Sequence, residues 1–188
     1  MTHLERLAIG DVLEIVPPRY SDRRGYFSEV FKRSDLEAQG VSIDWVQENH
    51  SFSAGIGTVR GLHYQAPPHA QAKLVRVLRG AIFDVAVDIR RGSPSYGKWV
   101  AAELSAEKWN QLLIPTGFAH GFLALTSDVE VLYKVSAGYA PECEGTLRWD
   151  DPDLAIEWPL ADTAILSAKD ANGLNFRHFL SPFTYGAA

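Results

Sequence analysis

Cysteine is nearly absent from this sequence, since the 188 residues include only Cys143. A disulfide framework within the chain is therefore excluded, and a zinc site built from several cysteines is unsupported. The chain also lacks an apolar run long enough to cross a bilayer. Its first residues, MTHLERLAIGDVLEI, include acidic side chains and show no signal-peptide pattern. We therefore expect a cytoplasmic protein that does not have a membrane as a partner.

Basic residues are fewer than acidic residues. The chain has 18 lysines and arginines against 23 aspartates and glutamates, a formal net charge of −5. A protein that binds duplex nucleic acid usually carries a strongly basic face, so we expect no nucleic-acid partner. No repeat, low-complexity segment or linker divides the chain, and its length is usual for one domain. We expect a single domain over residues 1–188.

The sequence does contain many short segments with alternating apolar side chains, separated by glycine and proline. This pattern is typical of an all-β sandwich or barrel. We expect little helix: a short one over 34–39, capped by Ser34 and ended by Gly40, and a helical turn or loop at 167–172. The expected strands cover residues 12–16, 26–31, 45–53, 58–65, 73–78, 81–89, 98–104, 111–114, 118–125, 129–135 and 145–149.

Residues 73–89 predict a β-hairpin that turns at Arg79-Gly80. Alternation with a period of two places Lys73, Val75 and Val77 on one face of the first strand. In the second strand it groups Asp84, Ala86 and Asp88 on one face. Two aspartates on one strand face are unusual for a core, but they suit a solvated face or a polar cavity.

Two segments resemble the motifs of cupins, which are jelly rolls also called double-stranded β-helices. Residues 115–120, PTGFAH, match the second cupin motif completely. The first is partial, because Gln65 follows His63 where a second histidine is usual, and Gln71 and Lys73 stand where a glutamate is usual. A lysine would repel a divalent cation, and the missing carboxylate is not replaced. We expect a cupin-type jelly roll with a few short helices and with neither a metal nor a cofactor.

The polar residues of this cavity suit removal of a proton next to a carbonyl group. Such a reaction needs a base and a group that stabilises the developing enolate oxygen. His63 is the candidate base, Lys73 the candidate enolate stabiliser, and Tyr133 the candidate acid that returns the proton. A neutral histidine base works best with a carboxylate that orients it. Spacing alone leaves three candidates for that carboxylate: Asp84, Asp88 and Asp170.

Nine segments together resemble the dTDP-4-dehydrorhamnose 3,5-epimerase family, metal-free cupins of bacterial deoxysugar synthesis. The resemblance implies epimerisation of a dTDP-4-dehydro-6-deoxysugar, a jelly roll, and a homodimer that shares N-terminal strands between subunits. The segments are DRRGYFSEVF (22–31), VQENHSFS (46–53), TVRGLHYQ (58–65), QAKLVRVLRGAIFDVAVDIR (71–90), SPSYGKW (93–99), IPTGFAHGF (114–122), VLYK (131–134), WDDPDLAIEWP (149–159) and LSAKD (166–170).

The resemblance also implies roles for individual residues. The family's base falls on His63, the carboxylate behind it on Asp170, its proton donor on Tyr133, and its enolate-side cation on Lys73. Tyr139 matches an aromatic residue that stacks on thymine. The implied contacts to the dTDP-sugar are Arg24, Glu29, Gln47, Asn49, Arg60, Lys73, His120, Tyr139, Glu144 and Lys169.

Arg60 and His63 lie three residues apart, so ideal alternation sends their side chains to opposite faces of a strand. Three explanations are open at this stage. A bulge at Gly61 re-aims one of the two side chains, Arg60 reaches the cavity from its rim, or Arg60 serves the other subunit's site.

Other activities fit parts of the same pattern. The nearest alternative is an epimerase acting only at C3 or only at C5, or a ketoisomerase on a related dTDP-4-keto-6-deoxysugar. Two further classes are a metal-dependent cupin oxygenase and a sugar-binding cupin without catalytic activity. Stoichiometric iron or manganese would indicate the first of these, and indifference to loss of His63 would indicate the second.

Overall fold

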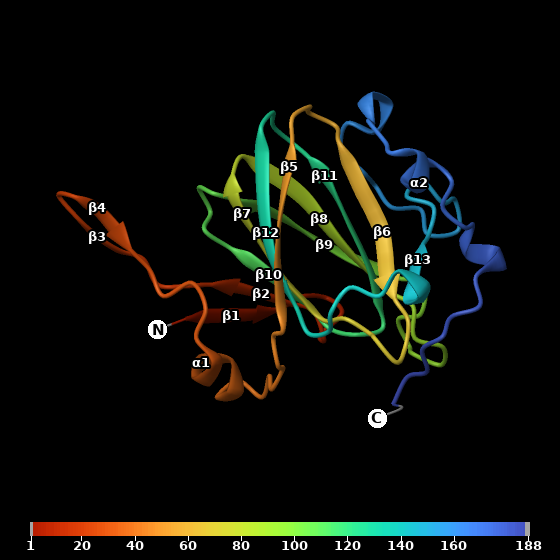
Figure 1. The fold of residues 1–188 in the computed structure, drawn as a ribbon, viewed down its shortest axis with the longest axis horizontal. Coiled ribbons are helices and arrows are strands. Elements are labelled where there is room, and N and C mark those ends of the chain that lie inside the picture. Colours follow the sequence, from red (N-terminus) through yellow and green to blue (C-terminus); the bar gives the residue numbers. More distant parts are fainter. Residues whose placement is uncertain (1, 187–188) are drawn as a thin grey trace.

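The computed structural model describes residues 2–186, which form two antiparallel sheets packed face to face (Figure 1). One sheet has the strand order β1-β2-β10-β7-β12-β5 and the other β13-β6-β11-β8-β9. This arrangement confirms the predicted all-β jelly roll with short helices. The strands are β1 (His3–Arg6), β2 (Leu13–Val16), β3 (Tyr20–Asp22), β4 (Gly25–Phe27), β5 (Gln47–Ser53), β6 (Val59–Gln65), β7 (Lys73–Arg79), β8 (Ala81–Asp88), β9 (Trp99–Ser105), β10 (Gln111–Ile114), β11 (Phe118–Ala124), β12 (Val129–Val135) and β13 (Glu144–Thr146).

The helices are short, and none between residues 2 and 186 is long and apolar enough to cross a membrane. Ser34 does not cap the first one as expected, because α1 begins one residue earlier and its N-cap is Lys32, which makes no side-chain cap. Ser167 does cap α2, since its Oγ accepts a hydrogen bond from the Asp170 backbone. The helices are α1 (Arg33–Glu37), α2 (Ala168–Ala171) and the 3₁₀ turns η1 (Pro141–Cys143), η2 (Ala161–Thr163) and η3 (Phe176–His178).

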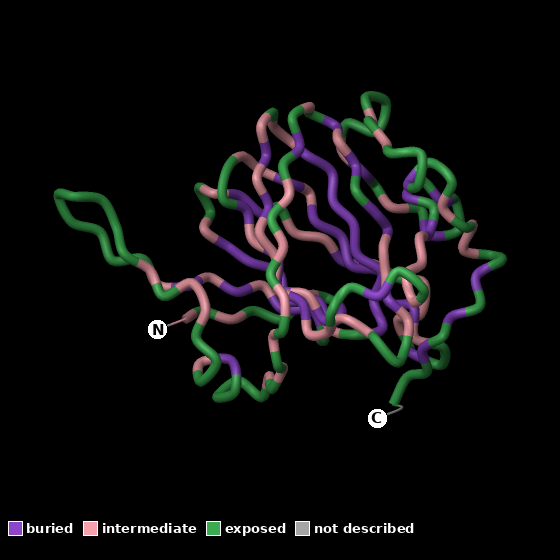
Figure 2. Tube along the Cα trace, viewed as in Figure 1, coloured by how far each residue is buried: buried purple, intermediate pink, exposed green. Residues whose placement is uncertain are grey.

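Apolar side chains fill the space between the two sheets, which Figure 2 shows as buried strands in the interior of the fold. Val75 and Val131 from one sheet meet Ile82 and Leu104 from the other in one cluster. A second cluster covers the outer face of the five-stranded sheet, where the chain after β13 packs Trp158, Phe179 and Phe183 against Val85, Val87 and Ile89 of the β8 segment. Strand β8 is thus covered on both faces, which explains its dense apolar sequence.

The predicted hairpin over 73–89 is wrong, although both of its strands exist. Strand β7 pairs with β10 and β12, whereas β8 pairs with β11 and β9 in the other sheet. The chain crosses between sheets at Gly80, whose φ is +78° and whose missing Cβ would lie 2.4 Å from Thr126 Oγ1. Because β7 and β8 lie in sheets that pack face to face, Val75 and Val77 of β7 are buried against Ile82 across the core. Pairing of β7 with β8 in one sheet would not bury these side chains against each other. The alternation within each strand is as predicted, because Leu74 packs in a separate outer cluster.

Strands β3 and β4 form a separate hairpin, the arm, which projects away from the two sheets (Figure 1). The expected strand over 26–31 therefore ends early, at Phe27. Three aromatic side chains of the arm are exposed, namely Tyr20, Tyr26 and Phe27, the last at 67%. An isolated two-stranded hairpin is marginally stable in water. We therefore expect these side chains to be covered by a further contact.

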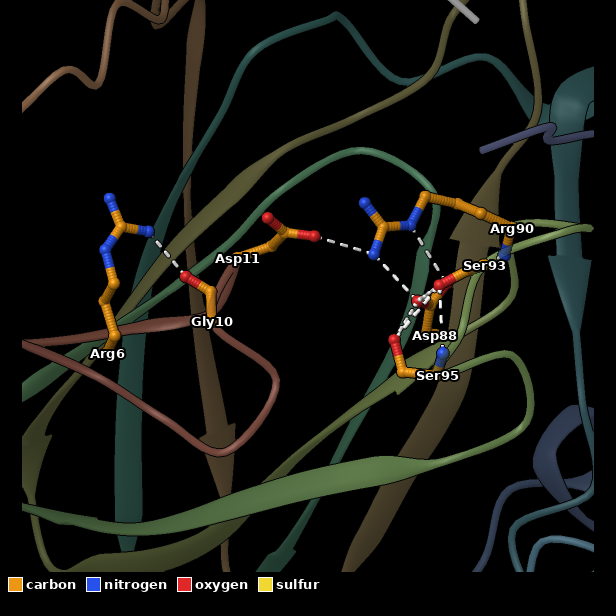
Figure 3. A network of polar contacts seen from close by, with 7 residues as sticks. All are labelled: Arg6, Gly10, Asp11, Asp88, Arg90, Ser93 and Ser95. Carbon is orange, nitrogen blue, oxygen red and sulfur yellow. Dashed lines mark hydrogen bonds and ion pairs between the residues drawn. The ribbon is translucent and has the colours of Figure 1, made fainter. Parts of the chain in front are cut away.

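One end of the barrel is held by a polar network around Asp88, which is completely buried (Figure 3). Its carboxylate accepts hydrogen bonds from the backbone and guanidinium of Arg90 and from the hydroxyls of Ser93 and Ser95. Burial alone would raise the pKa of Asp88, but these hydrogen bonds outweigh it and hold that pKa below its ordinary value. Arg90 also forms an ion pair with Asp11 at 2.8 Å. The network ties the end of β8 to the loop before β9 and to the turn before β2.

We expect Asp88→Ala to lower the free energy of unfolding by about 3–5 kcal/mol, because it removes one partner of a buried ion pair and leaves several donors unpaired. Urea unfolding measures this loss. The matched control is Asp11→Ala, which removes the exposed partner of the same arginine and should cost no more than about 1 kcal/mol. Equal losses in the two variants would contradict the role assigned to Asp88.

Candidate active site

A polar cavity opens between the sheets, next to the apolar core. One part, of about 340 Å³, is lined by strands β5, β6, β7, β11, β12 and β13 and by the α2 segment. An adjoining part, of about 300 Å³, extends to the segment around Tyr139. Both parts share four of the predicted site residues, so they form one continuous site: His63, Lys73, Tyr133 and Glu144.

His63 lies in this cavity with its carboxylate partner behind it. Its Nε2 is 2.5 Å from Oδ1 of Asp170, and Asp170 is only 4% exposed. The other Asp170 oxygen accepts a hydrogen bond from Ser167 Oγ at 2.7 Å. Burial raises the pKa of Asp170, but hydrogen bonds from His63, Ser167 and the Gly61 backbone outweigh it and lower that pKa. An ionised carboxylate at Nε2 assigns the proton to that nitrogen and leaves Nδ1 as the free base.

The structure thus selects one of the three carboxylates left open by spacing. Asp170 contacts His63, whereas Asp84 bonds to His120 at 2.7 Å and Asp88 bonds to Arg90. Asp170 is 107 residues from His63 in sequence, which is why local periodicity gave no sign of the pairing.

Strand β6 carries a bulge that brings Arg60 and His63 into the same cavity. On β11, His120 and Phe122 are two residues apart, yet their partners on β6 are His63 and Arg60, three residues apart. The extra residue lies next to Gly61, where an added Cβ would meet the backbone of Gly121 at 2.5 Å. Of the three explanations, the bulge at Gly61 is therefore confirmed.

Lys73 lines the same cavity as His63 but lies on the other sheet. Burial lowers the pKa of Lys73 to about 8, although Asp84 and Glu144 oppose this effect and Lys169 adds to it. At neutral pH the side chain is therefore mainly an ammonium ion inside a cavity, where water screens its charge poorly. Such a group can stabilise an oxyanion.

Tyr133 reaches the cavity from β12. Val129 and Val131 lie in the inter-sheet core and Tyr133 packs against the same cluster, as alternation with a period of two requires. Burial raises the pKa of the Tyr133 phenol, with Arg60 opposing and Glu144 adding to the rise. The phenol is therefore protonated at neutral pH and can donate a proton.

Further predicted residues line the cavity around these groups. Gln47 Nε2 donates to Asn49 Oδ1 at 2.7 Å, and Gln47 Oε1 accepts from the Tyr139 backbone. Glu144 accepts from Tyr139 Oη at 3.0 Å and pairs with Lys169 Nζ at 2.5 Å. The residues that the structure brings to the cavity are Gln47, Asn49, Arg60, His63, Lys73, His120, Tyr133, Tyr139, Glu144, Lys169 and Asp170.

Two predicted residues do not reach this cavity within the chain. Arg24 lies on the arm, where it forms an exposed ion pair with Asp22 at 2.6 Å. Glu29 lines a different cavity of about 440 Å³, together with Leu74 and Arg76 on the outer side of β7.

Sequence reasoning missed two serines of the cavity, Ser51 and Ser167. Ser51 follows Gln47 and Asn49 with a period of two, so strand alternation would have placed it on their face. Ser167 stands just before a helical turn, which is the usual place of a capping serine.

The two cupin-motif histidines do not lie in a metal-like cluster. Each bonds to a different aspartate, and Lys73 lies in the same cavity. Across residues 2–186, no three histidine, cysteine or acidic side chains are grouped so that they could hold a metal ion.

Comparison with known proteins gives one consistent result. The family profile described as dTDP-4-dehydrorhamnose 3,5-epimerase matches residues 6–178. The chain is 52% identical over 170 residues to the epimerase of that name from Sinorhizobium fredii, covering 90% of this chain and 87% of the relative. It is 51% identical over 172 residues to the one from Pseudomonas aeruginosa, covering 91% and 94%.

A solved structure agrees over the whole length. The dTDP-6-deoxy-D-glucose-3,5-epimerase from Legionella pneumophila, in complex with dTDP-4-keto-L-rhamnose, has a TM-score of 0.95 and 42% identity, with 100% of both chains covered. The fold, the His63–Asp170 pair and these matches all agree. The chain belongs to the dTDP-4-dehydrorhamnose 3,5-epimerase family.

Proposed function

We propose that this chain is a cofactor-independent isomerase that inverts C3 and C5 of dTDP-4-dehydro-6-deoxy-D-glucose. The product is dTDP-4-dehydro-L-rhamnose, an intermediate of dTDP-L-rhamnose biosynthesis. One observation carries the proposal: a carboxylate-backed histidine, a half-buried lysine and a protonated tyrosine share one cavity. The names of the similar proteins from S. fredii and P. aeruginosa support it.

The first chemical step is proton abstraction by His63. The C4 ketone acidifies the hydrogens on C3 and C5, so one site serves both carbons. As the C–H bond breaks, its electron pair moves toward the C4 oxygen, and Nδ1 of His63 takes the proton. Asp170 stabilises the imidazolium that forms, and the Lys73 ammonium stabilises the enolate oxygen.

The second step returns a proton to the other face of the same carbon. Tyr133 donates its phenolic proton, the C–H bond reforms with inverted configuration, and the C4 ketone is restored. His63 is then protonated and Tyr133 ionised, so exchange with water must return both to their starting states. Solvent hydrogen therefore enters the product at each inverted carbon.

The remaining cavity residues are proposed to hold the dTDP group. Arg60 and Lys169 are cations suited to the diphosphate, and Gln47, Asn49, His120 and Glu144 offer hydrogen-bonding groups. Tyr139 is 58% exposed at the edge of the site, where its ring can stack on thymine.

Incubation with the sugar in deuterated buffer tests the proposal directly. Proton NMR should show deuterium at both C3 and C5 of the product. No deuterium at either carbon would refute the function, and deuterium at one carbon only would identify a monoepimerase. Movement of the carbonyl group away from C4 would instead indicate a ketoisomerase.

We also propose that the protein acts as a homodimer in the cytoplasm and that the arm docks on the second subunit. The arm exposes Tyr20, Tyr26 and Phe27 and makes its strand pairing only within itself. Docking would bury these rings and bring Arg24 close to the partner's nucleotide site. The near absence of cysteine suits a reducing compartment.

The dimer predicts that Phe27→Asp yields a monomer, because a buried charge without a partner opposes association. Analytical ultracentrifugation measures the mass of the wild type and the variant. The control is Leu180→Asp, since Leu180 is 90% exposed and lies outside the arm. A monomeric wild type, or a Phe27→Asp variant that stays dimeric, would contradict the proposed role of the arm.

A further inference from the structure

The cavity contains a second histidine–aspartate pair, and its aspartate, Asp84, has no role in the proposed chemistry. His120 Nε2 lies 2.7 Å from Asp84 Oδ1, and the two residues are 8% and 0% exposed. In the sheet, His120 lies directly opposite His63 on one side and Ala86 on the other, and Asp84 pairs with Phe122. Asp84 therefore lies two residues from the register partner of His120 on β8 and reaches the His120 ring diagonally across the two strands.

The Asp84 carboxylate is incompletely satisfied. Its Oδ2 atom is buried and has no hydrogen-bond partner among residues 2–186. Asp88, on the same strand, is equally buried but accepts hydrogen bonds from Arg90, Ser93 and Ser95. A buried acceptor without a partner costs stability. Hydrogen bonds therefore do not fully stabilise a negative charge on the Asp84 carboxylate. Lys73 lines the same cavity as His120, the partner of Asp84, and Asp84 raises the pKa of Lys73.

We propose that Asp84 is a positioning residue for the epimerisation. Its Oδ1 orients the His120 ring on the cavity wall, and its negative charge keeps Lys73 as the ammonium ion that stabilises the enolate. The inference rests on the proposed function, because it concerns the charge of the group that faces the C4 oxygen. Asp84 acts through Lys73 and His120, not through contact with the substrate.

The charges around Lys73 agree with this role. Burial lowers the pKa of Lys73 to about 8, and Asp84 is the larger of the two carboxylate effects that oppose the fall. Burial also lowers the pKa of His120 despite the contact with Asp84, so His120 is neutral at pH 7. The ionisable groups that share the cavity with Lys73 are Arg60, His63, Tyr64, His120, Tyr133, Tyr139, Glu144, Lys169 and Asp170.

The test is the pH profile of kcat/KM for Asp84→Asn. Asparagine keeps an oxygen for His120 but removes the charge, so the pKa of Lys73 should fall and the alkaline limb should move from near pH 8 to about one pH unit lower. At pH 8 the protonated fraction of Lys73 would drop from about one half to about one tenth, which lowers kcat/KM about fivefold. At pH 6 the two enzymes should agree within about twofold, since Lys73 is protonated in both.

Asp88→Asn is the matched control, because it neutralises a buried aspartate on the same strand outside the cavity. Its alkaline limb should stay where the wild type has it, even if its stability falls. An unmoved limb in Asp84→Asn, or equal movement in both variants, would overturn the inference while leaving the epimerase function intact. Absence of deuterium exchange in the wild type would overturn the function and the inference together.

A measurement on the wild type keeps the inference testable if Asp84→Asn does not fold. Nitrogen-15 NMR of the histidine rings at pH 7 should show His120 protonated at Nε2 and unprotonated at Nδ1. This is the tautomer that an Asp84 carboxylate at Nε2 imposes. A proton on Nδ1 at pH 7 would overturn the inference.

Discussion

His63→Ala should remove deuterium exchange at both C3 and C5, lowering it by at least about 10²- to 10⁴-fold, the usual contribution of a positioned general base. Both carbons lose exchange together because His63, held by Asp170 at 2.5 Å, is the proposed base for two hydrogens made acidic by the same ketone. Proton NMR of the sugar in deuterated buffer measures the loss.

The control for this variant is His69→Ala, which removes an exposed histidine from the turn before β7 and should leave exchange unchanged. Binding serves as a second control, because dTDP should still raise the melting temperature of His63→Ala. Exchange that persists at both carbons would show that another group is the base. Loss at one carbon only would assign the other carbon to a different base.

Tyr133→Phe should separate proton removal from inversion. His63, Asp170 and Lys73 remain, so exchange should stay measurable, but the proton donor on the opposite face is lost. We expect the yield of inverted product to fall by about 10²-fold or more. The measurement follows deuterium incorporation and product configuration in the same sample.

Tyr96→Phe is the matched control, since Tyr96 packs against Phe176 outside the cavity and its hydroxyl should not affect the reaction. An unchanged yield of inverted product in Tyr133→Phe would show that the acid is misassigned. Loss of both exchange and inversion would show that Tyr133 also supports the first step.

Much of the site was predictable because it depends on local chemistry and on the family resemblance. Strand alternation grouped Lys73 with Val75 and Val77 on one face, and the structure confirms this, because the two valines lie in the inter-sheet core and Lys73 lines the adjoining cavity. The resemblance selected Asp170 as the carboxylate behind His63, and the contact is present. The same resemblance named Arg24, which the single chain holds on the arm away from the cavity.

The sequence by itself determined most of the core strands and, within β7, the alternation that puts Val75 and Val77 on the face opposite Leu74. Only the tertiary structure decided that β7 and β8 join different sheets, that Gly61 allows a bulge, and that Asp84 pairs with His120. The physical reason is that alternation is a local property of an extended backbone. Strand neighbours and buried ion pairs depend instead on how surfaces distant in sequence pack together.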